Sequence, residues 1–173
     1  IPVIDGGECE KGIESTIVQV DEEQKQVTLL RPGIISSTEI IDYLEKQNLD
    51  FHFDQKEKSI APGHLKNHYQ PQVPFLLVDS RKEITPELKR TIEAHFKENF
   101  VTWILNPTPE LAARQLYKDL RYFSSQQTPI MLAIDPLWKN SPAWSGIMDR
   151  LQKACHFYLE IEDSGQFKVT NKH

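Results

Sequence analysis

The sequence predicts an α/β protein with three successive parts, and two observations support this prediction. From about residue 75 onward, short apolar runs alternate with segments that repeat their apolar residues at helical spacing, which is typical of a small parallel sheet covered by helices. Between residues 51 and 74 the composition changes to charged residues and prolines, as expected of an ordered linker. We therefore expect a first unit over residues 1–50, a linker over residues 51–74 and a Rossmann-like parallel-sheet domain over residues 75–173.

The first unit opens with a glycine-rich segment, DGGECEKGIESTIV over residues 5–18. Three glycines within seven residues let the backbone approach a bound group closely, and Ser15 and Thr16 then begin a β-branched run that is suited to a strand. The segment is not a phosphate-binding P-loop, because Lys11 precedes Gly12 and no helical pattern follows. It is better interpreted as a ligand-holding turn that leads into a strand.

A β-hairpin is predicted next, because residues 15–20 and 27–30 form two apolar runs around the polar interval 21–24. The hairpin carries Arg31 back towards Ser15 and Thr16. A guanidinium group beside two hydroxyls suits a phosphate or a carboxylate. The alternative is a surface hairpin with a structural Ser-Thr pair and an exposed arginine.

A short capped helix should follow the hairpin. The tetrapeptide SSTE at residues 36–39 is typical of a helix start with a capping box, and Ile40, Ile41, Leu44 and Leu49 continue the helical pattern. We expect these apolar positions to face a core.

The linker predicted for residues 51–74 is an extended strap between two units, because its prolines restrict the chain and Gly63 supplies a turn. His64 and His68 are four residues apart, which on a helix would suit a metal ion and a metal hydrolase. The neighbouring prolines disfavour a helix, and the sequence offers no third ligand in register. We therefore expect no metal site here.

The third unit should contain alternating strands and helices joined by right-handed crossovers. In the predicted helix that begins at residue 108, Leu111, Leu116, Tyr117 and Leu120 should point inward. The predicted strands cover residues 74–78, 100–105 and 130–134, the predicted helices cover residues 85–96, 108–120 and 144–155, and residues 157–169 complete the sheet.

Polar dipeptides follow the predicted strands at 79–80, 106–107 and 135–136. Because such sheets bind ligands at the carboxyl ends of their strands, these dipeptides mark a candidate crevice. No GxGxxG motif follows any of these strands, and Asp79 and Asp135 fit equally well as helix-capping or turn residues. The arginines of the later helices, Arg150 among them, fit positions on solvated helix faces as well as they fit functional positions.

Composition excludes several classes of protein. Of 173 residues, 39% are hydrophobic, which is enough to bury a core. The net charge of −5 disfavours stable direct binding of nucleic acid, and no run of about 18 apolar residues could span a membrane. Cys9 and Cys155 lack a CxxC partner, so we expect free thiols and neither a disulfide framework nor a zinc site. We also expect a cytoplasmic location.

The segments DGGECEKGIESTIV, LLRPG and APGHLKNHYQP, in this order and with a helix before the last, resemble the second half of the two-domain YrdC-type threonylcarbamoyl-AMP synthases. The resemblance covers essentially the whole chain. It implies that residues 1–50 are the C-terminal part of a YrdC-like catalytic domain and that the family's upstream basic motif and Ser-x-Asn element are missing here. The family usually has Met and Ala where this chain has His64 and Gln70.

The resemblance also implies a reaction and a set of site residues. L-threonine, bicarbonate and ATP, with Mg²⁺ accompanying the triphosphate, would give threonylcarbamoyl-AMP and pyrophosphate, and a tRNA-modifying transferase partner would receive the product. Ser15 and Thr16 would bind threonine, Arg31 a nucleotide phosphate, and His68 and Tyr69 would cover the nucleotide. The catalytic residues stay unknown, and the third unit would be an accessory domain.

A second function class also fits the sequence. Because the upstream basic motif is missing, the chain could be a catalytically inactive, truncated module whose α/β domain recognises a nucleotide or a partner. Pyrophosphate production from ATP, threonine and bicarbonate would distinguish the two hypotheses.

Overall fold

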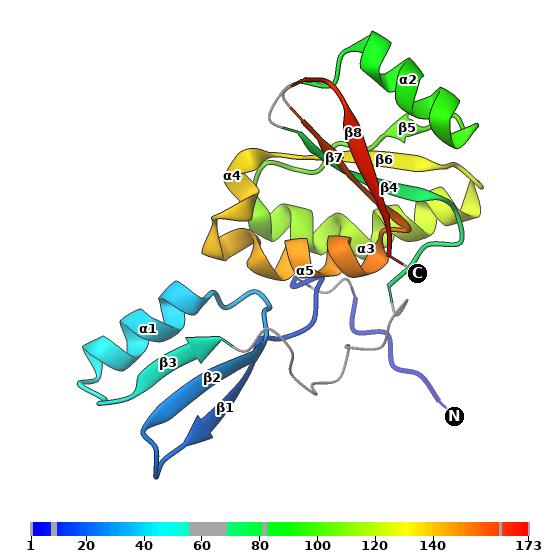
Figure 1. Ribbon diagram of the computed structural model, residues 1–173. Coiled ribbons are helices and arrows are strands. Elements are labelled where there is room, and N and C mark those ends of the chain that lie inside the picture. The colour runs from blue at the N-terminus through cyan, green and yellow to red at the C-terminus, as the bar shows by residue number, and fades with distance from the viewer. Residues whose placement is uncertain (1, 8–9, 56–68, 81–82, 163, 173) are drawn as a thin grey trace.

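The computed structural model describes residues 2–7, 10–55, 69–80, 83–162 and 164–172. Within these ranges the chain forms a mixed α/β structure with two separate sheets (Figure 1). One sheet has three strands in the order β1-β2-β3, and the other has five in the order β5-β6-β4-β7-β8. None of the described helices combines the length and the hydrophobicity that a membrane-spanning helix needs.

The three-stranded sheet contains the predicted hairpin. Strands β1 (Ile17–Asp21) and β2 (Gln26–Arg31) pair antiparallel, and Lys25 takes a positive φ of 50° in the turn between them. The third strand, β3 (His52–Gln55), pairs parallel to β2 and was not predicted. Residues 52–55 of the range expected to be linker are therefore part of this sheet.

Helix α1 (Ser37–Lys46) begins at the predicted capping box. The Ser36 hydroxyl accepts a hydrogen bond from the Glu39 backbone N–H, and the Glu39 carboxylate accepts one from the Ser36 backbone N–H. The expectation that the apolar positions of α1 face a core is wrong, because no residue of this helix is buried. The helix lies along one small sheet, and no other described element covers its remaining apolar side (Figure 1).

The five-stranded sheet is the centre of the larger unit. Strands β4 (Phe75–Ser80), β5 (Val101–Thr102), β6 (Ile130–Ile134) and β7 (Phe157–Ile161) pair parallel, and β8 (Phe167–Asn171) adds an antiparallel edge. Strand β5 is shorter than the predicted span of residues 100–105. The Trp103 backbone N–H still donates to the Met131 carbonyl oxygen at 2.8 Å, and the side chains of Trp103 and Leu105 pack into the core.

Helices cover both faces of this sheet (Figure 1). Because successive side chains of β4 point to opposite faces of the sheet, each face has its own hydrophobic core. Phe75 and Leu77 pack with α3 and α5, and Leu76 and Val78 pack with Ile92 of α2. The bounds are α2 (Pro86–Phe96), α3 (Pro109–Ser125), α4 (Pro136–Lys139), a 3₁₀ turn η1 (Pro142–Trp144) and α5 (Ser145–Ala154).

The predicted inward face of α3 is only partly correct. Leu116 and Leu120 are buried, but Leu111 is 44% exposed. It lies in the first turn of α3 on a different side of the helix from Ala112 and Ala113, which are buried.

The glycine-rich segment and the loop after β2 dock against α3 and α5 through close backbone contacts. A Cβ added to Gly146, in the first turn of α5, would lie 2.6 Å from the Gly33 carbonyl oxygen. A Cβ at Gly33 would lie 2.3 Å from the Thr16 backbone nitrogen, and one at Gly12 would lie 2.4 Å from the Ala113 carbonyl oxygen. The first unit is thereby held against the helices by contacts that only glycine permits.

Replacing Gly146 by alanine should therefore lower the free energy of unfolding by about 1–3 kcal/mol, because the neighbouring atom is backbone and cannot move aside easily. Urea unfolding measures the change. Gly6→Ala is the matched control, since a Cβ there meets nothing within 4 Å. Equal stability of the two variants would contradict this account of the docking.

Candidate functional site

Arg31 and Ser15 lie together, as the hairpin prediction required. The Arg31 side chain donates to the Ser15 carbonyl oxygen from Nε at 3.1 Å and from Nη2 at 2.9 Å, and Nη2 lies 3.4 Å from Ser15 Oγ. Arg31 is only 7% exposed, whereas Ser15 is exposed. A buried positive charge therefore lies beneath an exposed hydroxyl, an arrangement that favours an anion.

Thr16 has a different partner from Ser15. Its hydroxyl donates to the Ile35 carbonyl oxygen at 2.8 Å, which ties the start of β1 to the loop that follows β2. The same loop contains Gly33, whose close approach to the Thr16 backbone was described above. Ser15, Thr16 and Arg31 thus belong to one rigid corner of the three-stranded sheet.

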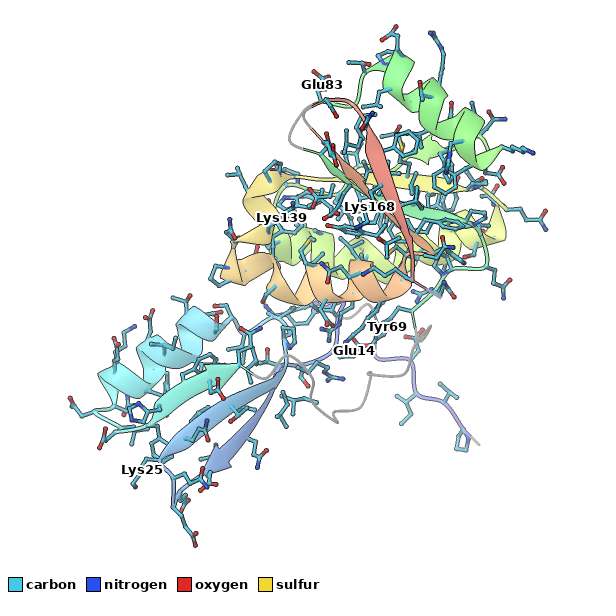
Figure 2. All side chains as sticks on the ribbon, in the orientation of Figure 1. Glu14, Lys25, Tyr69, Glu83, Lys139 and Lys168 are labelled. Atoms are coloured by element: carbon cyan, nitrogen blue, oxygen red, sulfur yellow. The ribbon has the colours of Figure 1, made fainter. Side chains whose placement is uncertain are left out.

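Glu14 connects this corner to the larger unit. Its Oε2 accepts a hydrogen bond from the Tyr117 hydroxyl of α3 at 2.9 Å and another from Arg150 Nε of α5 at 3.1 Å. The Tyr69 ring stacks on the Tyr117 ring at a centroid distance of 5.4 Å. Figure 2 shows Glu14 and Tyr69 beside each other below α3 and α5. Sequence analysis assigned no role to Glu14.

Arg150 is completely buried, so a solvated helix face is wrong for this residue. Besides Glu14, its guanidinium contacts the carbonyl oxygen of Pro32 and lies 3.1 Å from the Asp149 carboxylate. Its Nη2 atom has no hydrogen-bond partner within the described ranges. The sequence contained a signal for this burial, because Arg150 falls on the same helical stripe as the buried Ile147 and Leu151.

These contacts perturb the ionisation of Glu14. Burial raises the pKa of its carboxyl, but hydrogen bonds from the backbone, Tyr117, Tyr69 and Arg150 outweigh burial, so the pKa lies below its ordinary value of 4.5. Burial and the hydrogen bond to Glu14 raise the pKa of both Tyr69 and Tyr117. At neutral pH the cluster therefore consists of a carboxylate held by two neutral phenols and a guanidinium.

A cavity of about 590 Å³ adjoins the two tyrosines, and Glu14, Gln72, Arg121 and Ser124 also contribute to its walls. His64 and His68 lie outside the described residues, so only Tyr69 of the predicted His-Tyr pair is placed. Within the described residues, no group of three or more His, Cys, Asp or Glu side chains could hold a metal ion.

The prediction of free thiols can be compared with the structure only at Cys155, because Cys9 lies outside the described residues. Cys155 is a free thiol and fully buried, and burial raises its pKa to about 11. It is accordingly inert rather than nucleophilic at neutral pH.

Replacing Arg150 by methionine should lower the free energy of unfolding by about 1–3 kcal/mol, because Glu14 and Asp149 lose the cation between them while keeping some contact with water. Thermal or urea unfolding tests this. Arg90→Met is the control, since Arg90 is 75% exposed and its ion pair with Glu87 is at the surface. The prediction fails if both variants unfold alike.

The stability that Glu14 provides should depend on pH. Because its folded pKa is lowered, the contribution is complete above the unfolded value of about 4.5 and disappears as the pH falls through the folded pKa. The difference in unfolding free energy between the natural chain and Glu14→Gln should therefore be largest near neutral pH and shrink in acid. A difference that stays constant down to about pH 3 would contradict the lowered pKa.

The chain is similar to known proteins over most of its length. The family model described as "Threonylcarbamoyl-AMP synthase, C-terminal domain" matches residues 35–155. The threonylcarbamoyl-AMP synthase of Pyrococcus abyssi (strain GE5 / Orsay) is 30% identical over 178 residues, which cover 91% of this chain and 50% of that protein. The threonylcarbamoyl-AMP synthase of Bacillus subtilis (strain 168) is 33% identical over 82 residues, covering 47% of this chain and 23% of that protein.

A solved structure has the same fold. It is a P. abyssi Sua5 variant in which an adjacent His-Tyr pair is replaced by alanines, and it superposes with a TM-score of 0.62 at 21% identity, covering 91% of this chain and 50% of that one. The chain spans about half the length of the P. abyssi relative. Taken together, the family match over residues 35–155 and the 30% identity show that this chain belongs to the threonylcarbamoyl-AMP synthase family.

Proposed function

We propose that the chain is the C-terminal part of an L-threonylcarbamoyladenylate synthase, which forms threonylcarbamoyl-AMP and pyrophosphate from L-threonine, bicarbonate and ATP. In this proposal residues 1–50 belong to the catalytic domain together with β3 (His52–Gln55), the rest of the range up to residue 74 forms the linker over the active site, and residues 75–173 form the Rossmann-like accessory domain. Ser15 and Thr16 bind threonine, and Arg31, His68 and Tyr69 bind the nucleotide.

The contact between Arg31 and Ser15 is the observation that carries the proposal. Two hydrogen bonds from Arg31 go to the Ser15 backbone carbonyl, so the guanidinium is oriented before any ligand arrives. Adenylyl transfer depends mainly on positioning and on cations near the phosphate charge. A pre-oriented guanidinium beside an exposed hydroxyl supports joint binding of the nucleotide and of threonine.

The position of Tyr69 supports its proposed role over the nucleotide. Its ring already stacks on Tyr117, so its orientation is restricted before any ligand binds, and the half-buried face of the pair lines the cavity described above. The relative whose solved structure matches was studied with an adjacent His-Tyr pair replaced, and His68-Tyr69 is such a pair in this sequence.

Mg²⁺ enters the proposal only as the partner of the triphosphate. Glu14 is the carboxylate beside Ser15, and it is already held by Tyr117 and Arg150. Since Mg²⁺ is commonly bound through substrate phosphates with few protein ligands, the described residues fit an ion that arrives with ATP, and none is named as its ligand. When bound, the ion would neutralise phosphate charge.

The proposed product is an activated intermediate, so the partner is a tRNA-modifying transferase and the place of action is the cytoplasm. The acidic net charge of −5 supports delivery through such a protein rather than stable binding of tRNA by this chain. The second candidate is a catalytically inactive nucleotide- or partner-binding module. The exposed apolar side of α1 is the observation that favours the binding module, because an uncovered apolar surface could bind a partner. This argument applies if the chain occurs in cells without a further catalytic segment.

In the synthase that contains this chain, Arg31→Lys should weaken ATP binding by about tenfold or more, because lysine keeps the charge but loses the two bonds that orient the guanidinium. Calorimetric titration of ATP measures the loss. Arg90→Lys, at an exposed site on α2, should leave the affinity unchanged.

Two further measurements decide between the candidates. The intact mass of the native protein, captured from its source cells, should exceed 20.1 kDa by the mass of about one domain if the synthase proposal is right. A native mass of 20.1 kDa, with no pyrophosphate formed from ATP, threonine, bicarbonate and Mg²⁺, would favour the binding module. Unchanged ATP affinity in Arg31→Lys would remove Arg31 from the nucleotide site.

A further inference from the structure

The parallel sheet has a topological switch point between β4 and β6. These two strands are neighbours, but the chain leaves β4 towards α2 on one face and leaves β6 towards α4 and α5 on the other face. Figure 1 shows both exits at the same edge of the sheet. When neighbouring parallel strands send their connections to opposite faces, a crevice opens beyond their carboxyl ends, and ligands of open α/β sheets bind there.

A cavity of about 320 Å³ lies at this edge. Ser80 ends β4, Thr102 ends β5, and Ala133 lies near the end of β6, and all three contribute to its walls together with Met131 and Lys89. Two of the three polar dipeptides that sequence analysis singled out flank it, since Ser80 and Pro136 are wall residues. Asn106 instead accepts a hydrogen bond from the Thr108 backbone N–H and begins the turn before α3.

The cavity opens on the α2 side because the other side of the edge is closed. Asp79 points to the α5 side, where it pairs with Lys139 of α4 and accepts a hydrogen bond from the Tyr158 hydroxyl at 2.7 Å. Asp135 caps α4 by accepting from the Leu137 backbone N–H. Both aspartates are thus occupied in holding α4, and the open side is lined by a separate set of polar groups.

Those polar groups are of both signs. Glu83 and Lys89 come from the connection between β4 and α2 and from α2 itself, and the hydroxyls of Ser80 and Thr102 lie at the strand ends. Lys89 Nζ lies 3.6 Å from Glu93 Oε1. Because an ammonium group has three hydrogen-bond donors, Lys89 can bind a second carboxylate as well. Met131 and Ala133 supply an apolar wall.

We propose that this crevice binds a small zwitterion of the α-amino acid class. The ligand's carboxylate pairs with Lys89, its ammonium group pairs with Glu83, and its short side chain contacts Met131 and Ala133. The volume is at the lower end of the range for ligand sites, which suits a small ligand. The site lies on the larger unit, separate from the Ser15 and Arg31 corner.

Methionine methyl NMR can test this site directly, because the chain has two methionines. Met131 lies in the wall of the cavity, whereas Met148 lies on α5 in the core on the opposite face of the sheet. In protein labelled with ¹³C at the methionine methyl groups, L-alanine, L-serine or L-threonine at up to about 20 mM should move the Met131 signal along a saturable curve and leave Met148 in place. Met131→Leu assigns the two signals.

Matched ligands and variants complete the test. L-lactate lacks the ammonium group and ethylamine lacks the carboxylate, so neither should produce the Met131 shift. Lys89→Met should weaken binding at least about tenfold, and Glu83→Gln should also weaken it. The exposed neighbours provide the controls Arg90→Met and Glu87→Gln, which should bind as the natural chain does.

Three results would overturn the proposal. The first is no saturable shift of the Met131 signal with any of the three amino acids, and the second is a Met131 shift with L-lactate or ethylamine as large as that with the amino acids. The third is equal amino-acid affinity of Lys89→Met and Arg90→Met. The outcome is independent of the proposed synthase activity. The Met131 titration repeated with Arg31→Lys should be unchanged, so a failure at the Arg31 corner and a failure at the crevice are distinguishable.

Discussion

The buried guanidinium of Arg150 holds the two parts of the described structure together. It extends from α5 to Glu14 and to the carbonyl oxygen of Pro32, which lie just before β1 and just after β2. A charge in such a position is stable only while its partners are in place. This side chain therefore helps to fix the positions of the glycine-rich segment and of the loop after β2 relative to the larger unit.

Close backbone packing reinforces the same junction. Gly146 lies in the first turn of α5, one helical turn before Arg150, and it admits the Gly33 backbone where any side chain would collide. Ser15 and Arg31 lie on the sheet corner that these contacts anchor. The α/β unit thus acts as a framework that anchors the corner bearing Ser15 and Arg31.

The larger unit has a second polar edge of its own. On one side of the switch point, Asp79, Lys139 and Tyr158 form a closed cluster that fixes α4. On the other side, Ser80, Glu83, Lys89 and Thr102 contribute to the walls of a cavity. Since α4 leads through η1 into α5, the helix that bears Arg150, the crevice and the Ser15 corner are connected by one continuous segment.

Local residue patterns were sufficient to predict the features that depend on neighbouring residues. The capping box at Ser36, the cap of α2 at Thr85 and the antiparallel hairpin follow from local turn chemistry and alternation, and the hairpin alone was enough to predict that Arg31 returns to Ser15. The helical patterns likewise located α2, α3 and α5.

Features that depend on distant partners arise from packing in the folded chain and could not be predicted. Glu14 and Arg150 are 136 residues apart, and their contact turned an expected surface arginine into a buried one. Strand β3 forms by pairing with β2 across the intervening helix α1, and the side chains of Trp103 and Leu105, beyond the end of β5, pack into the core of the larger unit. Such outcomes depend on which surfaces meet in space, and local propensity does not contain that information.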